Sequence, residues 1–201
     1  MLHNLRNWDR QALLWLQEHF RRAGLTLAMK IATFLGNGGI IWLTACACLL
    51  FRPETRRASV TALLSLLFSI FINNIMLKHL VARVRPFDRI QGLTVLIRRP
   101  QDFSFPSGHT SSSFAVATVF LSMLPLWVGL AAMTLAVLIA FSRLYLGAHY
   151  PSDVVCGAVL GVLFGLAALY LMPLLLKSSW LPDSVRTWFD LDVLKMARFY
   201  S

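Results

Sequence analysis

The stretch that decides the fold is residues 106–148, PSGHTSSSFAVATVFLSMLPLWVGLAAMTLAVLIAFSRLYLGA. As one continuous helix it would be about 64 Å long, far more than the ~30 Å hydrocarbon core of a bilayer. Pro125 lies near its middle, and proline breaks a helix because it has no N–H to donate. The sequence therefore predicts two membrane-spanning helices, at 107–124 and 126–146, joined by a very short turn.

Three more apolar stretches flank this one, at residues 25–51, 58–77 and 153–176. Each is long enough to cross a bilayer as a helix. The chain as a whole is 57% hydrophobic and only 14% charged, more apolar than a soluble domain of 201 residues would bury. The predicted fold class is an all-α integral membrane protein, a helical bundle of about five transmembrane helices.

Polar breaks divide the first half of the chain. The sequence GNGG at residues 36–39 interrupts the first apolar stretch, so we expect that helix to bend or partly unwind there. Residues 52–57, RPETRR, are expected to form a tight polar turn before the second span. After Lys78, arginines and a proline open an irregular loop that ends near Phe105.

The two ends of the chain are predicted to lie at the membrane surface. Residues 1–23 mix Trp, Leu and Phe with charged side chains, which favours an interfacial amphipathic helix, although a polar cap on the bundle would show the same pattern. Charges interrupt every apolar stretch of this segment, so no cleavable signal peptide is expected. We predict a single domain over residues 1–201, with this helix, a transmembrane bundle at 24–176 and an interfacial or cytoplasmic tail at 177–201.

Counting the crossings brings distant polar residues to one face. Lys78 ends the second predicted span, the residues before Pro106 lead into the third, and the residues after Leu146 follow the fourth. The third and fourth spans cross and return, so all three points lie on the same face. Ionisable groups beside apolar segments are costly, and they mark functional sites. The polar residues that this face gathers are Lys78, Arg85, Ser107, Gly108, His109, Arg143, His149 and Asp153.

The composition also indicates the binding partners. The formal net charge is +10, but the arginines lie at the ends of apolar segments and form no soluble basic face. Anionic membrane lipids are therefore the expected counter-charge, and no nucleic acid is expected. Cys46, Cys48 and Cys156 lie in apolar runs without metal-binding spacing, so we interpret them as buried thiols.

Each cluster has a catalytic and a structural interpretation. Ser107-Gly108 begins a helix whose free N–H groups would bind an anion, but Ser and Gly also start many ordinary helices. His149 and Asp153 are four residues apart, so the carboxylate could hold one ring nitrogen and leave the other free as a nucleophile. The alternative is a helix cap without chemistry. The cation Arg143 nearby favours the catalytic interpretation.

A metal site is the other interpretation of two histidines and one aspartate. Three cations at the same face would repel a divalent ion, and the ligand set is thin. Cations and backbone N–H groups stabilise a transferring phosphoryl group without a metal. We therefore expect metal-independent phosphoryl transfer through a histidine, with no cofactor.

The motif spacing resembles that of the type 2 phosphatidic acid phosphatases, membrane relatives of bacterial acid phosphatases and vanadium haloperoxidases. That family carries Lys, six residues, Arg-Pro; then Pro-Ser-Gly-His; then Ser-Arg, five residues, His, three residues, Asp. Residues 78–86, 106–109 and 142–153 match the three motifs without a gap. The resemblance covers roughly residues 25–176.

The resemblance implies a role for each site residue. His149 would attack phosphorus to form a phosphohistidine, Asp153 would hold the tautomer of His149, and His109 would protonate the leaving oxygen. Water would then hydrolyse the intermediate. The residues that would bind the phosphate oxygens are Lys78, Arg85, Ser107, the Gly108 amide and Arg143.

The expected activity is removal of a terminal phosphate from a lipid phosphate or pyrophosphate. Candidate substrates are undecaprenyl pyrophosphate, phosphatidylglycerol phosphate, phosphatidic acid and diacylglycerol pyrophosphate. The alternatives are a lipid phosphotransferase with the same intermediate and a non-catalytic anionic-lipid binding or transport protein. Arg83, Arg98 and Arg99 are expected to touch a headgroup, to guide anions or simply to be solvated. The short Arg-rich turn and the resemblance favour a bacterial plasma membrane with the active site on the extracytoplasmic face.

Overall fold

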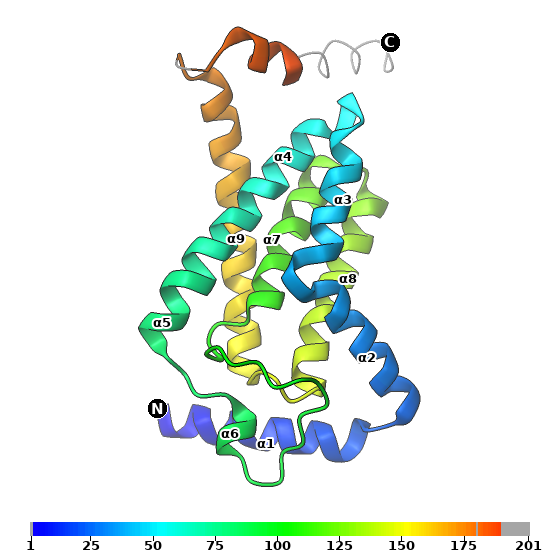
Figure 1. Cartoon of the computed structure of the whole chain (residues 1–201), viewed down its shortest axis with the longest axis vertical. Helices are drawn as coiled ribbons and strands as arrows, with labels where there is room; N and C mark the ends of the chain where they lie inside the picture. The colour runs from blue at the N-terminus through cyan, green and yellow to red at the C-terminus, as the bar shows by residue number, and fades with distance from the viewer. Residues whose placement is uncertain (1, 180, 190–201) are drawn as a thin grey trace.

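Long apolar helices stand side by side in a bundle, and a further helix crosses one end of it (Figure 1). The computed structural model describes residues 2–179 and 181–189, and no strand occurs among them. The predicted all-α class is thereby confirmed. The helices are α1 (Leu2–Phe20), α2 (Ala23–Gly36), the 3-10 turn η1 (Asn37–Gly39), α3 (Ile40–Leu50), α4 (Pro53–Phe68), the π-helical segment η2 (Ser69–Leu77), α5 (Lys78–Val81), α6 (Pro86–Arg89), α7 (Gly108–Met123), α8 (Leu126–Tyr145) and α9 (Pro151–Lys177).

The membrane-spanning part of the chain differs slightly from the five predicted spans. Within the described residues, four helical runs are long and apolar enough to cross a membrane: Ala23–Leu50, Pro53–Arg89, Leu126–Tyr145 and Pro151–Lys177. The predicted span at 107–124 corresponds to α7, which has only 16 residues. It packs against α4, α8 and α9 at the centre of the bundle, where most of its apolar residues, among them Val116, Val119 and Phe120, are buried by protein. The chain is therefore an integral membrane protein whose central helix is shorter than α8, with 20 residues, and α9, with 27.

The predicted breaks at GNGG and Pro125 lie where the sequence placed them, but the turn predicted at 52–57 is wrong, because residues 53–57 already belong to helix α4. At GNGG, residues Gly38 and Gly39 have φ values of 57° and 70°, a left-handed backbone that glycine adopts readily. They turn α2 away from the axis of α3 (Figure 1). Pro53 begins α4 at the first helical position, where its missing N–H costs nothing. Pro125 separates α7 from α8.

A row of glycines on α9 allows α7 to pack unusually close. Gly157, Gly161 and Gly165 all face α7, and a Cβ atom added at Gly157 would lie 2.8 Å from the Ser107 carbonyl oxygen. Small residues spaced four apart permit this close backbone approach between membrane helices. The beginning of α7, which carries one predicted cluster, is therefore fixed against the beginning of α9, which carries another.

We expect Gly161→Ala to lower the melting temperature of the detergent-solubilised protein. The added Cβ would collide with the Ser111 carbonyl oxygen and lie 2.8 Å from Phe114 Cβ, and overpacking of this kind costs about 1–3 kcal/mol. The matched control is Gly24→Ala, because a Cβ there would meet nothing within 4 Å. Equal melting temperatures for the two variants would contradict the close packing of α7 on α9.

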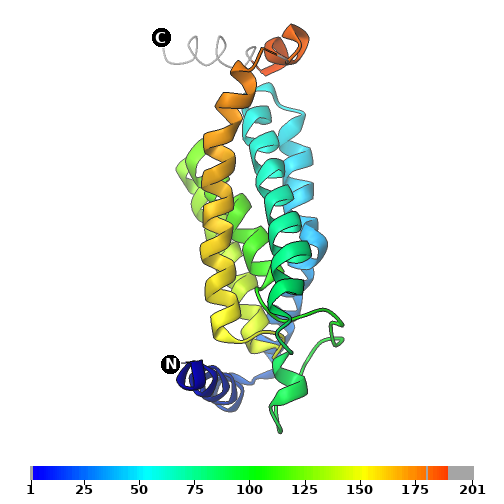
Figure 2. The same cartoon turned by 90° about the vertical axis from the view of Figure 1, so that its left-hand side faces the viewer.

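Helix α1 lies across the end of the bundle at which the chain begins (Figure 1, Figure 2). Its inner face buries Asp9, Leu13 and Gln17, while Trp8 and Trp15 are exposed on its outer face. The predicted amphipathic pattern is therefore present in α1. At the opposite end, residues 183–189 form a helical segment after α9. The rest of the predicted tail, at 180 and 190–201, lies outside the described residues.

Candidate active site

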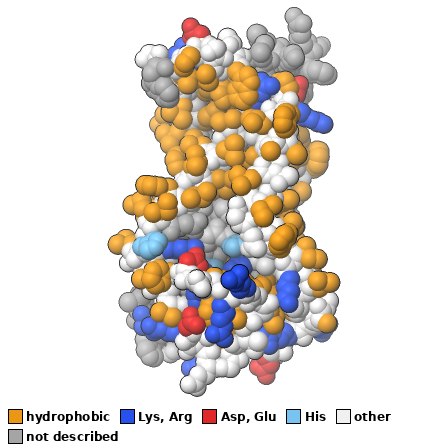
Figure 3. Space-filling model, in the orientation of Figure 1, with side chains coloured by type: hydrophobic (Ala, Val, Ile, Leu, Met, Phe, Trp, Pro, Cys, Tyr) orange, Lys and Arg blue, Asp and Glu red, His pale blue; other side chains and the backbone are white. Residues whose placement is uncertain are grey.

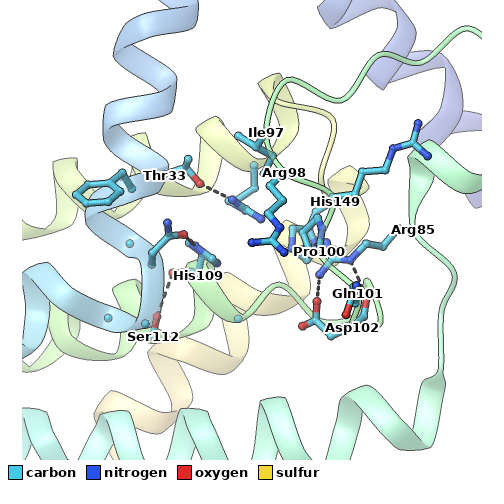
Figure 4. A pocket seen from close by; sticks show the side chains of 18 of the residues that line it. Thr33, Arg85, Ile97, Arg98, Pro100, Gln101, Asp102, His109, Ser112 and His149 are labelled. Carbon is cyan, nitrogen blue, oxygen red and sulfur yellow. Dashed lines mark hydrogen bonds and ion pairs between the residues drawn. The ribbon is translucent and has the colours of Figure 1, made fainter.

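A cavity of about 940 Å³ lies at the end of the bundle near α1 and collects residues from all three sequence clusters. Figure 4 shows this cavity with the side chains that surround it. Six of the eight predicted site residues line it, and the other two, Ser107 and Asp153, are fully buried behind its wall. The six that line the cavity are Lys78, Arg85, Gly108, His109, Arg143 and His149.

His149 lies in the short connection between α8 and α9 and is only 1% exposed. Its Nδ1 atom is 2.7 Å from the backbone carbonyl oxygen of Ser104. A carbonyl oxygen only accepts hydrogen bonds, so Nδ1 carries the proton and Nε2 presents its lone pair. Nε2 is 3.3 Å from Nη1 of Arg85, at the wall of the cavity. The ring is thus held in the tautomer that a nucleophile requires.

The contact between Asp153 and His149 differs from the one expected. Asp153 Oδ2 is 3.7 Å from His149 Nδ1, which is too long for a hydrogen bond. Instead Oδ2 accepts hydrogen bonds from the Ser104 hydroxyl and, at 2.9 Å, from the Tyr150 N–H. Ser104 therefore bridges the pair, since its carbonyl holds the imidazole and its hydroxyl holds the carboxylate. Nothing in the three motifs pointed to Ser104.

The surroundings of His149 keep its ring neutral. Burial lowers the pKa of His149 to about 4, and the charges of Arg143 and Arg85 act in the same direction. The Asp153 carboxylate opposes this shift without outweighing it. At neutral pH, Nε2 is therefore unprotonated, and its lone pair accepts a hydrogen bond from Arg85 Nη1.

Lys78 and Arg85 share one carboxylate that the sequence did not single out. Asp102 Oδ2 lies 2.5 Å from Lys78 Nζ. Asp102 Oδ1 lies 2.6 Å from Arg85 Nη2, and Figure 4 shows this second contact. Burial favours the neutral acid, but the hydrogen bond and charge of Lys78 and the charge of Arg85 outweigh it and hold the pKa of Asp102 well below its ordinary value. The Asp102 side chain is 51% exposed at the cavity, so its carboxylate bridges the two cations as an anionic ligand would.

Arg143 is a buried cation without a counter-charge. It is 2% exposed, its Nη1 donates to the Thr33 hydroxyl on α2, and its Nε has no partner. Among the residues that the structure describes, no carboxylate forms an ion pair with it. A buried guanidinium in this state is costly unless an anion binds beside it. Arg143 and Thr33 both line the cavity, so the anion would bind there.

The beginning of α7 supplies the rest of the site. His109 Nε2 is 2.8 Å from Oδ1 of Asn37, a residue of the GNGG break that sequence reasoning had not assigned to the site. Gly108 lines the cavity at the first position of α7. Ser107 accepts a hydrogen bond from the Thr110 hydroxyl, and its N–H donates to the Asp153 carbonyl at 3.1 Å. The Ser107 N–H thus joins α7 to α9 and does not point to a free anion site.

The cavity also has an apolar side that reaches the outer surface of the bundle. Phe34, Leu43 and Ile70 line it and are 61%, 47% and 49% exposed, respectively. They come from α2, α3 and η2, so the opening faces sideways between these elements. Figure 3 shows apolar side chains covering the bundle and Lys and Arg side chains gathered at the end near α1, with a hollow at the border. No group of three His, Cys, Asp or Glu residues in the described part of the chain is arranged to hold a metal ion.

The fold and the site together define a class of protein. It is an all-helical membrane protein whose cavity is lined by histidines and cations and opens sideways through apolar residues. A sequence model of the PAP2 superfamily matches residues 58–177, which include all eight predicted site residues. The chain belongs to the PAP2 superfamily. The family resemblance inferred from the motifs is thereby confirmed.

Relatives with curated names and a solved structure show the same relationship. The chain is 33% identical to an undecaprenyl-diphosphatase of Sulfolobus acidocaldarius over 133 residues, 65% of this chain and 64% of that protein. It is 38% identical to a putative undecaprenyl-diphosphatase of Escherichia coli over 113 residues, 56% of each chain. The chain thus spans less than two thirds of these relatives. A phosphatidylglycerolphosphate phosphatase from Bacillus subtilis superposes with a TM-score of 0.70 at 25% identity, over 89% of this chain and 90% of that one.

Proposed function

We propose that the protein hydrolyses the terminal phosphate of a lipid phosphate or pyrophosphate, without a metal, through a phosphohistidine on His149. The observation that carries this proposal is the buried, neutral imidazole whose Nε2 faces the cations of the cavity. A nucleophile, an orienting acceptor and cations for the phosphate oxygens are the parts that such a transfer needs.

In the first step, His149 Nε2 attacks phosphorus and the bond to the leaving oxygen breaks. Lys78, Arg85 and Arg143 hold the phosphate oxygens, which take the place of the Asp102 carboxylate beside the first two cations. The imidazolium charge that develops is stabilised by the Ser104 carbonyl and by Asp153. These groups are fixed before the reaction, so little reorganisation is needed.

Proton transfer falls to His109 at the beginning of α7. In its protonated form it gives a proton to the leaving oxygen, and the neutral ring then accepts a proton from the water that hydrolyses the phosphohistidine. Asn37 Oδ1, at 2.8 Å from Nε2, keeps the ring in place. Ser107 and the Gly108 amide remain predicted ligands of the phosphate oxygens.

The substrate class follows from the shape of the cavity and from the relatives. Cations on one side and exposed apolar residues on the other suit a phosphate headgroup with an apolar tail. The similar proteins are named for undecaprenyl diphosphate and phosphatidylglycerol phosphate. We therefore favour undecaprenyl pyrophosphate and phosphatidylglycerol phosphate, with phosphatidic acid and diacylglycerol pyrophosphate as further candidates.

The same proposal includes one domain in a bacterial plasma membrane, with α1 in the interface and the cavity on the extracytoplasmic face. The exposed Trp8 and Trp15 on α1 support an interfacial position. A reporter fused after Ser201 should then be cytoplasmic, because α9 ends at the end of the bundle opposite the cavity. An extracytoplasmic reporter would overturn this orientation.

The test is phosphate release by the purified protein from a panel of the four candidate lipids, in excess chelator. Release that persists in chelator supports metal-independent hydrolysis, and the ranking of kcat/KM identifies the preferred lipid. Phosphate recovered on a second lipid or sugar instead of in solution would favour the phosphotransferase. Binding of these lipids without any product would favour a transport or binding protein.

The pH dependence of this activity should reflect the lowered pKa of His149. Attack requires the neutral ring, and a ring with a pKa of about 4 instead of 6.5 stays neutral as the pH falls well below neutrality. We expect the acid limb of kcat/KM that belongs to the free protein to lie near pH 4, after correction for ionisation of the substrate. An acid limb centred near pH 6.5 would contradict the buried, neutral imidazole.

A further inference from the structure

A second network of charges lies behind His149 and joins it to the N-terminal helix. Asp9 of α1 is fully buried, and its Oδ2 lies 2.6 Å from Nη2 of Arg83. The N–H and hydroxyl of Ser152 also donate to Asp9, at 2.9 Å and 2.6 Å. All these partners lie outside α1, in the α5–α6 connection and the first turn of α9. Asp9 belongs to none of the three motifs.

Both terminal nitrogens of Arg83 are held by neighbouring side chains, although the side chain stays 22% exposed. Its Nη1 donates to Asp153 Oδ1 at 2.6 Å and to the Ser152 hydroxyl at 2.7 Å, and its guanidinium lies 3.9 Å from the centre of the Tyr150 ring. It does not line the cavity of the candidate active site. Arg83 forms ion pairs with Asp9 and Asp153, which the sequence did not predict.

These contacts form one continuous chain of polar groups. Asp9 forms an ion pair with Arg83, and Arg83 forms another with Oδ1 of Asp153. Oδ2 of Asp153 accepts a hydrogen bond from the Ser104 hydroxyl, and the Ser104 carbonyl accepts one from His149. Two carboxylates and one guanidinium leave a net negative charge behind the ring. That charge matches the imidazolium that forms when His149 attacks, whereas a single carboxylate paired with Arg83 would leave no net charge.

Because these groups are buried, each of them depends on its partners to stay in position. Asp9 and Asp153 are both 0% exposed, so neither carboxylate can turn to water if Arg83 is lost. Breaking a buried ion pair by removing one partner leaves an uncompensated charge that displaces its neighbours. A displacement of about 1 Å at a reacting group is enough to slow a reaction about 100-fold.

We propose that Asp9 and Arg83 are positioning residues for the reaction, so that α1 completes the active site from outside the matched superfamily region. Arg83 fixes Asp153, and Asp9 fixes Arg83 while restoring the negative charge that Arg83 cancels. This inference rests on the proposed roles of His149 and Asp153. The position of α1, which carries none of the motif residues, would therefore affect the rate of the reaction.

The test uses the full chain in detergent with Asp9→Asn, Arg83→Gln, Arg83→Lys and the double variant Asp9→Asn/Arg83→Gln. Glu18→Gln on the exposed face of α1 and Arg89→Gln on α6 are the matched controls. We expect kcat to fall about 10-fold in Asp9→Asn and about 100-fold in Arg83→Gln, with KM little changed, because neither residue lines the cavity. Arg83→Lys should recover part of the loss.

The pH profile separates positioning from a purely structural role. The charged or titratable groups around His149 are Asp153, Arg85, Arg143 and His109, and all four are retained in every variant. Loss of a cation in Arg83→Gln should move the acid limb of kcat/KM to higher pH, and loss of an anion in Asp9→Asn should move it to lower pH. The double variant should return towards the original profile. Lower melting temperatures with no opposed shifts of the acid limb would overturn the proposal.

His149→Ala in the same series keeps this inference distinct from the proposed function. Activity that survives His149→Ala would overturn the proposed chemistry itself. Loss of activity in His149→Ala, with Asp9→Asn and Arg83→Gln indistinguishable from Glu18→Gln and Arg89→Gln, would overturn only the positioning role. Should Asp9→Asn fail to fold, the comparison of Arg83→Lys with Arg83→Gln still decides the outcome.

Discussion

Replacing His149 by alanine is expected to lower kcat for phosphate release by at least about four orders of magnitude, as removal of an enzyme's nucleophile does. Among the described residues that line the cavity, no other side chain combines the features of a nucleophile that His149 has. His149 Nδ1 is held by the Ser104 carbonyl at 2.7 Å, and Nε2 faces the cations at the cavity wall. Quenching in alkaline detergent during turnover of a substrate labelled in the phosphate that is removed should leave label on the wild-type chain and none on the variant, and acid treatment should then release that label.

The matched control is His79→Ala. His79 is exposed on α5, its Nδ1 lies 2.8 Å from the Ile75 carbonyl, and it does not line the cavity. This variant should release phosphate at close to the wild-type rate. Activity retained by His149→Ala, or lost equally in both variants, would exclude His149 as the nucleophile.

The second large effect is expected at Arg143, where activity and stability should change in opposite directions. Arg143→Met should lower kcat/KM by about 100-fold to about 1,000-fold, since a donor aimed at the transition-state oxygens is lost. The melting temperature without ligand should stay the same or rise. The reason is that Arg143 is a buried cation whose Nε has no partner among the described residues and whose Nη1 donates to the neutral Thr33 hydroxyl.

Two measurements check this expectation. Kinetics with the preferred lipid give the change in kcat/KM, and thermal unfolding in detergent, with and without inorganic phosphate, gives the change in stability. Phosphate should stabilise the wild-type protein and have little effect on Arg143→Met. Arg52→Met, an exposed arginine at the opposite end of the bundle, is the control. A large fall in melting temperature without phosphate would show that Arg143 is mainly structural.

Much of this architecture could be predicted because it depends on lengths and breaks that the sequence displays directly. Pro125 and the GNGG sequence divide the apolar stretches where the helices end, and counting crossings placed Lys78, His109 and His149 at one end. The shortness of α7 was missed, since its apolar run continues to the turn at Pro125. The glycine row on α9 was missed too, although Gly157, Gly161 and Gly165 are spaced four apart and could have indicated close packing.

The groups that orient the site could not be predicted from local pattern. Asp102 and Ser104 lie in an irregular connection with no periodicity, and its course depends on tertiary contacts. Asp9 meets Arg83 from 74 positions away in the chain, so no spacing rule links them. The expected hydrogen bond from His149 to Asp153 looked reasonable at a separation of four residues. In the folded chain the Ser104 carbonyl, from another segment, accepts it instead.

The apolar side opening of the cavity determines how substrate is supplied. Phe34, Leu43 and Ile70 border the opening on the surface that faces the hydrocarbon of the bilayer. A lipid that enters there arrives by diffusion within two dimensions, so its effective concentration is its mole fraction in the membrane. For the proposed lipid substrate, adding inert phospholipid at fixed bulk substrate should therefore slow turnover, whereas diluting the vesicle suspension with buffer should leave the rate per protein molecule unchanged.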